Sequence, residues 1–175
     1  TAGGVTTFCE GGNVVLTANP ADGDSYSWYK NGVLIATALG NSYTATTSGN
    51  YYVDITRSNC TETSNTIAVT VNPLPADKTI TSTNYCQGTA GGTITIPLTE
   101  VGVTYTLYTS PGMVLTKTPL AGNGANRSWT SVVAGTYVVI ASNVSCSRTL
   151  NTVTVIMNAL PSFGTGPYAA DNVLC

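Results

Sequence analysis

The stretch Ser25-Tyr26-Ser27-Trp28-Tyr29-Lys30-Asn31-Gly32 decides the fold of this 175-residue chain. Small polar and aromatic residues alternate in its first part, which is typical of a strand that buries one face. The Asn-Gly pair that follows favours a tight turn, because both residues tolerate a positive φ. The stretch therefore predicts a β-strand that carries Trp28 on its core face and then reverses direction.

Short alternating runs of the same kind recur about every ten residues, and Gly, Pro, Asn and Asp stand between them. No stretch places apolar residues at helical spacing over three turns. The runs of the first half of the chain are residues 13–18, 25–30, 33–36, 42–46, 51–57 and 66–71. Six or seven short strands in about 75 to 85 residues predict an antiparallel β-sandwich.

The sequence repeats itself at a fixed offset. Cys60 and Cys146 differ by 86 positions (146 − 60), and the same offset superimposes many other residues. Among these pairs are Gly49 with Gly135, Tyr51 with Tyr137, Thr63 with Thr149, and Leu74-Pro75 with Leu160-Pro161. An internal period outweighs any single motif. We therefore expect domain 1 at residues 1–75, domain 2 at residues 76–161, and the start of a third repeat at residues 162–175.

The first halves of the two repeats are less alike than the second halves. Cys9 to Gly49 spans 40 positions and Cys86 to Gly135 spans 49, so we expect the extra residues in the Gly- and Asn-rich segment 121–126. In the second repeat Leu107 stands in place of Trp28, and Trp129 stands in place of Tyr43. We expect this exchange to move the bulk of the core to a facing strand.

Two motifs resemble the immunoglobulin-like family. Tyr26-Ser27-Trp28-Tyr29-Lys30-Asn31-Gly32 is similar to its third strand, and Ser48-Gly49-Asn50-Tyr51-Tyr52-Val53 is similar to the Gly-x-Tyr that opens its sixth strand. The order of the cysteines, these motifs and the final Leu-Pro resembles the Ig-like repeats of large secreted cell-surface adhesins of Bacteroidetes, including gliding-motility adhesins exported by the type 9 system. The resemblance implies an all-β chain of tandem Ig-like sandwiches joined end to end by short Pro-containing linkers.

The repeat also suggests how the cysteines pair. Cys9 with Cys60 and Cys86 with Cys146 would each bracket one unit, and each bridge would close a loop of about 50 residues and contribute about 4 kcal/mol. A metal site is disfavoured because the chain has neither a C-x-x-C motif nor a histidine. We further expect Cys175 to be the opening cysteine of the third repeat.

Disulfides imply an oxidising compartment. We therefore expect an extracellular, cell-surface location, with association to the outer membrane through other parts of a longer protein. No signal peptide stands at Thr1-Ala2-Gly3-Gly4, and no apolar run approaches membrane-spanning length, so we expect no membrane insertion. The fragment itself is expected to be monomeric.

Composition argues against catalysis and nucleic-acid binding. Only 8% of the residues are charged, histidine is absent, and the eight carboxylates are scattered and do not recur between repeats. We expect no enzyme activity and no cofactor. Six Lys and Arg at a net charge of −2 do not make a phosphate-binding groove, so we expect no nucleic-acid partner. Asp22-Gly23-Asp24 offers two calcium ligands, but a polar turn explains it better because the rest of a calcium loop is missing.

Outward-facing tyrosines give the alternative function. If Trp28 and Tyr51 face the core, Tyr29 and Tyr52 face outward on the same sheet and are candidates for stacking on a sugar ring. This would suit carbohydrate-binding accessory modules of a secreted polysaccharide-degrading enzyme, with surface polysaccharide as partner. Val138 replaces Tyr52 in the second repeat, whereas the core and linkers recur. We therefore favour structural shaft or spacer modules of an adhesin, whose partners are neighbouring repeats.

Overall fold

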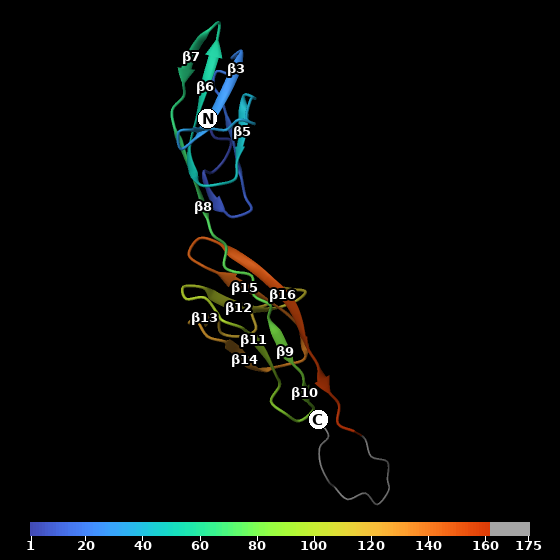
Figure 1. Ribbon diagram of the computed structural model, residues 1–175. Helices are drawn as coiled ribbons and strands as arrows, with labels where there is room; N and C mark the ends of the chain where they lie inside the picture. Colours follow the sequence, from blue (N-terminus) through green and yellow to red (C-terminus); the bar gives the residue numbers. More distant parts are fainter. Residues whose placement is uncertain (162–175) are drawn as a thin grey trace, which may run out of the picture. The chain divides into compact units, whose positions relative to one another are not determined.

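The computed structural model describes residues 1–161, which form strands and loops without any helix (Figure 1). The expected all-β, immunoglobulin-like class is confirmed. No helix in this described range is long and apolar enough to cross a membrane. The chain divides into two compact units, unit 1 at Thr1–Pro73 and unit 2 at Leu74–Cys175. The expected third repeat and Cys175 lie outside the described residues.

Unit 1 consists of two sheets. The larger has the order β1-β8-β6-β3-β4, with β7 added beside β6, and the smaller pairs β2 with β5. A bridge between Ala2 and Leu16 adds the start of the chain to β2. The strands are β1 (Thr7–Cys9), β2 (Val14–Thr17), β3 (Ser25–Lys30), β4 (Val33–Leu34), β5 (Ser42–Ala45), β6 (Gly49–Arg57), β7 (Cys60–Thr63) and β8 (Ile67–Asn72). All six strands expected from alternation are present, and β1 and β7 are additional.

The core of unit 1 lies between these two sheets. Trp28 and Tyr51 are both buried, as expected, and they pack with residues of the facing sheet such as Leu16 and Ala45. Tyr43 of β5 lies next to both aromatic rings, with centroids 6.0 Å from Trp28 and 5.7 Å from Tyr51. Alternation along β3 and β6 therefore sorts one side chain inward and the next outward, which fixes the position of Tyr29 and Tyr52.

Unit 2 has the same design with additions. Its strands are β9 (Thr81–Thr83), β10 (Tyr85–Cys86), β11 (Gly92–Ile96), β12 (Thr104–Thr109), β13 (Leu120–Ala121), β14 (Arg127–Val132), β15 (Gly135–Ser142), β16 (Ser147–Val155) and β17 (Met157–Asn158). They form the sheets β14-β11-β9, β13-β12-β15-β16 and β10-β17. β13 ends at Ala121, the first residue of the segment 121–126 where extra residues were expected, and no strand of unit 1 corresponds to it.

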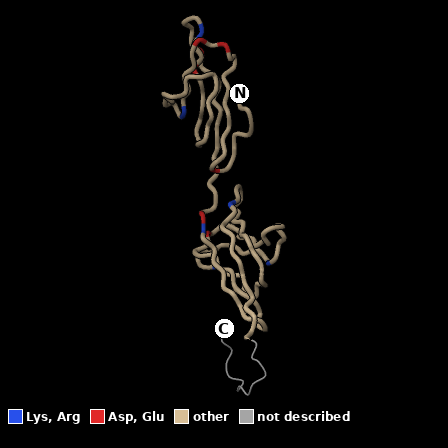
Figure 2. The backbone as a smooth tube through the Cα atoms, turned by 90° about the vertical axis from the view of Figure 1, so that its right-hand side faces the viewer, with Lys and Arg blue, Asp and Glu red and all other residues tan. Residues whose placement is uncertain are grey.

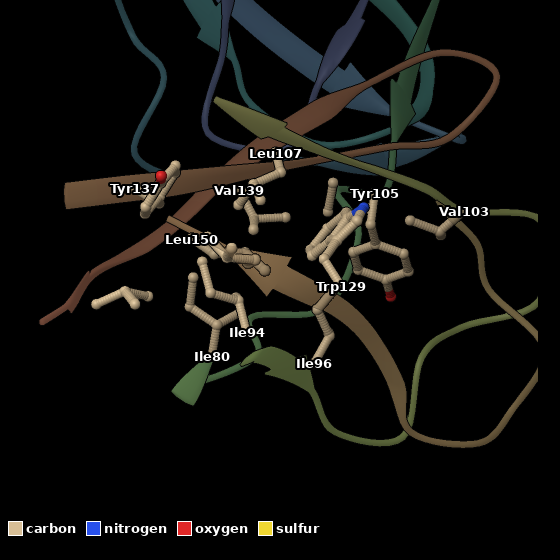
Figure 3. Packing of buried hydrophobic residues seen from close by; sticks show 13 residues of the cluster. Ile80, Ile94, Ile96, Val103, Tyr105, Leu107, Trp129, Tyr137, Val139 and Leu150 are labelled. Carbon is tan, nitrogen blue, oxygen red and sulfur yellow. The ribbon is translucent and has the colours of Figure 1, made fainter. Parts of the chain in front are cut away.

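The exchange of tryptophan between strands is visible in the core of unit 2 (Figure 3). Leu107 of β12 and Trp129 of β14 are both buried in one cluster with Tyr105, so the large ring now comes from the facing sheet. The indole keeps its polar contact in both units. Trp28 Nε1 donates to the Gly40 carbonyl at 3.0 Å, and Trp129 Nε1 donates to the Thr118 carbonyl at 2.9 Å. Gly40 lies between β4 and β5, which belong to different sheets, whereas Thr118 lies just before β13, which stays beside β12 in the same sheet.

The first and last strands of each unit pair in parallel, which the sequence did not lead us to expect. In unit 1, Thr7, Phe8 and Cys9 of β1 lie beside Thr70, Val71 and Asn72 of β8. In unit 2, Tyr85 and Cys86 of β10 lie beside Met157 and Asn158 of β17. The remaining strand pairs of both units are antiparallel. Parallel pairing places the opening cysteine of each unit next to the last residues of its final strand.

Candidate functional site

Tyr29 and Tyr52 lie side by side on the outward face of unit 1. They are direct partners in the β3–β6 ladder, and their rings stack with centroids 4.8 Å apart and planes 9° from parallel. Both side chains are half-buried. Each ring therefore covers one face of the other, which leaves a sugar less open ring surface than two separate tyrosines would offer.

Asp54 and Thr63 complete this surface, which we call the aromatic patch (Tyr29, Tyr52, Asp54 and Thr63). Thr63 Oγ1 donates to Asp54 Oδ1 at 2.6 Å. Desolvation and then the nearby Asp54 charge raise the pKa of Tyr29, so the phenol stays protonated well above neutral pH. The Asp54 carboxylate is thus already bonded to Thr63.

Sequence reasoning found the two tyrosines but missed the other half of the patch. Asp54 stands two residues after Tyr52 on β6, so period-two alternation alone would have placed it on the same face. The position of Thr63 beside Asp54 could not be predicted, because β7, the strand that carries Thr63, was not expected. Unit 2 has Tyr108, Val138, Ile140 and Thr149 at the corresponding places. Glycan stacking by Tyr29 and Tyr52 remains a prediction.

The tyrosine pair is expected to stabilise unit 1. A stacked cross-strand pair is worth about 0.5–1.5 kcal/mol beyond its buried area. A double-mutant cycle with Tyr29→Ala and Tyr52→Ala, measured by urea unfolding, should give a coupling energy of that size. A coupling energy within error of zero would show that the rings lie together without stabilising each other.

The cysteines are arranged differently from the expected pairing. Cys9, Cys86 and Cys146 are disulfide-bonded, and Cys60 is free and exposed. The predicted Cys9–Cys60 bridge is therefore wrong. Cys9 lies next to Asn72, beyond the Gly49 end of β6, whereas Cys60 pairs with Arg57 at the other end of that strand. Nine extended residues span about 30 Å, and a disulfide requires Cα atoms within about 7 Å.

The predicted Cys86–Cys146 bridge is wrong for the same reason. Cys86 lies next to Asn158, which follows β16, whereas Cys146 immediately precedes β16 in the turn where Ser142 pairs with Ser147. The nine residues of β16 again separate the two sulfurs by about 30 Å. The stabilisation of about 4 kcal/mol expected from closing a 50-residue loop inside each unit therefore does not apply.

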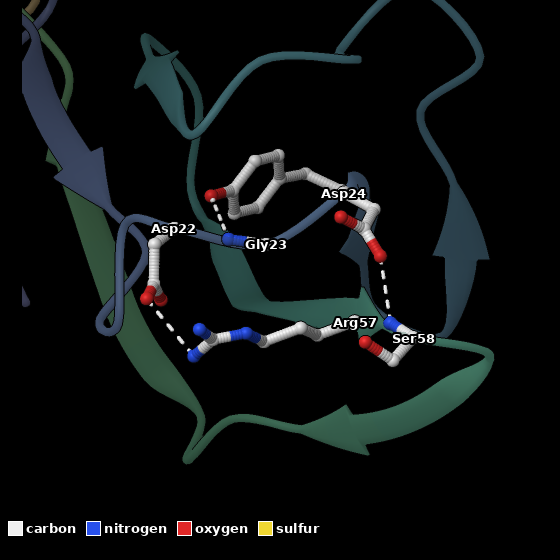
Figure 4. Close-up of polar contacts among 6 residues, drawn as sticks. Asp22, Gly23, Asp24, Arg57 and Ser58 are labelled. Atoms are coloured by element: carbon white, nitrogen blue, oxygen red, sulfur yellow. Dashed lines mark hydrogen bonds and ion pairs between the residues drawn. The ribbon is translucent and has the colours of Figure 1, made fainter.

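A hollow of about 390 Å³ lies beside Cys60 at one end of unit 1. The loop before β3 and the β6–β7 hairpin form its walls, and two polar contacts join them (Figure 4). Arg57 Nη1 lies 2.9 Å from Asp22 Oδ2, and the Ser58 amide donates to Asp24 Oδ2 at 2.6 Å. Both aspartates of the Asp22-Gly23-Asp24 turn thus bond to the hairpin, which gives the turn a structural explanation.

Other chemistry is sparse in the described part of the chain. Residues 1–161 contain no group of three His, Cys, Asp or Glu side chains placed to hold a metal ion. Charged residues are few and spread along both units (Figure 2). Within residues 1–161, the aromatic patch and the free thiol of Cys60 are the features that we consider as recognition sites.

Comparison with known proteins places unit 1 among immunoglobulin-like domains. Residues 1–73 match the family described as "Ig-like domain CHU_C associated". Domains of this family serve structural or binding roles and are typically non-catalytic. No curated protein matches the chain.

Two solved structures show low similarity over most of the chain. One is a mouse coronavirus receptor-binding domain complexed with its murine receptor (17% identity, TM-score 0.46, covering 87% of this chain and 96% of that one). The other is the human OSCAR ligand-binding domain (13% identity, TM-score 0.38, covering 88% and 95%). Neither likeness is strong enough to support an argument about function.

Proposed function

We propose that these units are structural spacer modules of a large secreted cell-surface adhesin, and that attachment or gliding depends on the array and its other parts. The observation that carries the proposal is what the two units share. Both keep a buried core, a buried indole that donates to a backbone carbonyl, and a parallel pair of end strands. The half-buried aromatic patch is not repeated in unit 2, which has Val138 and Ile140 in place of Tyr52 and Asp54. A spacer must preserve its core and ends, whereas a binding module must preserve its surface.

The parallel end strands support this role mechanically. Tension that pulls β1 and β8 apart along their length acts on all of their hydrogen bonds at once. These include Thr70 N to the Thr6 carbonyl at 2.8 Å and Glu10 N to the Asn72 carbonyl at 2.9 Å. Unit 2 repeats the arrangement with Tyr85 N to the Ile156 carbonyl and Gln87 N to the Asn158 carbonyl. Shearing several bonds together requires more force than breaking them one after another.

Localisation and partners follow from the same proposal. Three disulfide-bonded cysteines suit an oxidising environment, so we place the protein outside the cell, attached to the surface through other parts of the chain. Its partners in this proposal are neighbouring modules. With six Lys and Arg in the sequence and no cationic cluster along the traced units, nucleic acid is not among the proposed partners (Figure 2). We propose no catalytic role.

The second candidate is a carbohydrate-binding accessory module. It is favoured by one observation, the aromatic patch with its carboxylate, since sugars bind through aromatic faces and polar side chains. The stacking of Tyr29 on Tyr52 and the different residues in unit 2 count against it.

A binding assay separates the two functions. The full chain, tested on a glycan array and by pull-down with insoluble polysaccharides, is expected to bind no more than Tyr52→Ala does. Specific retention of the wild type that Tyr52→Ala abolishes, with Tyr108→Ala as the matched control in unit 2, would overturn the spacer function. Tyr52→Phe would then report whether the ring or the hydroxyl group is needed.

A further inference from the structure

Cys60 lies at the end of unit 1 where the chain enters. The Thr1 amino group donates to the Thr17 carbonyl at 2.6 Å, and residues 19 and 20, just beyond β2, line the same hollow as Cys60. The chain leaves the unit at the opposite end, where Asn72 lies beside Cys9. The exposed thiol thus lies toward the end of unit 1 that holds the first residues, opposite the end that holds Cys9.

Cys146 holds the corresponding position in unit 2. It lies in the β15–β16 turn as Cys60 lies in the β6–β7 turn, at the repeat offset of 86 (146 − 60). Cys146 also lies at the end of unit 2 where the chain enters. The Ala76 amide, near the start of the unit, donates to Glu100, which precedes β12. Thr104, the first residue of β12, pairs with Ser142 beside the β15–β16 turn. Cys146 is disulfide-bonded, and Cys86 is too far away to be its partner. The cysteine of this hairpin turn is therefore disulfide-bonded in unit 2 (Cys146) and a free thiol in unit 1 (Cys60).

The surroundings of Cys60 suit a covalent junction. The turn has a tight conformation, in which Ser58 and Asn59 both have a positive φ and the Ser58 amide donates to Asp24 Oδ2. The hollow beside the thiol is open, and it offers the apolar side chain of Ile55 together with the paired charges of Asp22 and Arg57. A segment that reached this end would pack in the hollow and bring its own cysteine close to the Cys60 thiol.

We propose that Cys60 is a covalent docking site for a preceding module of the same type, to whose opening cysteine, the equivalent of Cys9 and Cys86, it becomes bonded. The inference rests on the proposed function, since it requires modules in series. In chemical terms, the two thiols lose two protons and two electrons and form one S–S bond. A small disulfide such as oxidised glutathione accepts the electrons and is reduced to two thiols. Neighbouring modules would then be joined by a sulfur bridge as well as by the polypeptide.

The test adds a module ahead of unit 1. A further copy of residues 1–77 is fused ahead of Thr1 of the full chain. Residues 76 and 77 of the copy, followed by residues 1–9, then reproduce the 11-residue spacing from Pro75 to Cys86 (86 − 75). Both proteins are equilibrated with a glutathione redox buffer, alkylated with N-ethylmaleimide, and mapped by mass spectrometry without reduction. Cys60 of the original unit should be alkylated in the unfused chain and at least about tenfold less in the fusion, where it should be linked to Cys9 of the added copy.

Two control variants sharpen the result. Cys9→Ser in the added copy should restore alkylation of Cys60, and Cys60→Ser in the original unit should leave Cys9 of the copy alkylated. Alkylation of Cys60 in the fusion equal to that in the unfused chain would overturn the proposal, as would a bond to glutathione or to a second molecule. The mapping does not depend on glycan binding, so the spacer function and the covalent junction fail separately.

Discussion

Replacing Trp129 with alanine is expected to destabilise unit 2 by about 3–5 kcal/mol, the range for removing a large aromatic side chain from a core. The ring belongs to one buried cluster with Tyr105, Leu107 and Ile96 (Figure 3). Leu107 does not fill the cavity that the lost indole leaves, because its side chain is already buried in the same cluster, at the position that Trp28 holds in unit 1. The change also leaves the Thr118 carbonyl without its indole donor.

Hydrogen exchange followed by mass spectrometry measures this effect for each unit separately, since peptides of β11, β12 and β15 report on unit 2 alone. Trp129→Phe is the matched control. It keeps an aromatic ring and loses mainly the bond to Thr118, so we expect a cost of about 1–2 kcal/mol. A loss below about 1 kcal/mol for Trp129→Ala would mean that the core closes over the gap and that the ring is not central to unit 2.

Alternation and turn residues were enough to predict most of unit 1. Five of the six expected strands have mainly small or polar residues on one face and apolar residues on the other, with turn residues such as Gly, Asn and Pro between strands. β4 is the exception, because Val33 and Leu34 are both apolar and both exposed, and it was found from the Asn-Gly turn before it. β7 was not predicted because all four residues from Cys60 to Thr63 are exposed, so the sequence has no alternation of buried and exposed residues there. β1 was not predicted because it has only three residues and pairs in parallel with a strand about 60 positions away in the sequence.

The cysteine pairing could not be predicted from spacing. Two cysteines that bracket a sandwich suggest a closed loop, but the sequence does not show at which end of the strands each one lies. The parallel pairing of β1 with β8 places Cys9 at the exit end, and the β6–β7 turn places Cys60 at the entry end. The relevant signal was the repeat itself, because Cys9 and Cys86 share one place and Cys60 and Cys146 share the other.

Gly92→Ala is expected to destabilise unit 2 by about 3 kcal/mol, at the upper end of the cost of overpacking a core. Gly92 opens β11 in the middle of a three-stranded sheet and is buried. A Cβ atom there would collide with the Thr83 carbonyl of β9 and would lie 2.7 Å from a methyl group of Val155. Since the backbone carbonyl cannot rotate away, β9 must shift from β11.

The shift has a local signature that separates it from a general loss of stability. The Thr93 amide, which donates to Thr83 Oγ1 at 3.0 Å, should lose hydrogen-exchange protection before the β12–β15 ladder does. Gly4→Ala is the matched control, because nothing lies within 4 Å of its Cβ, and its effect should stay within about 0.5 kcal/mol. Equal stability of Gly92→Ala and the wild type would show that β9 packs more loosely on β11 than the structure indicates.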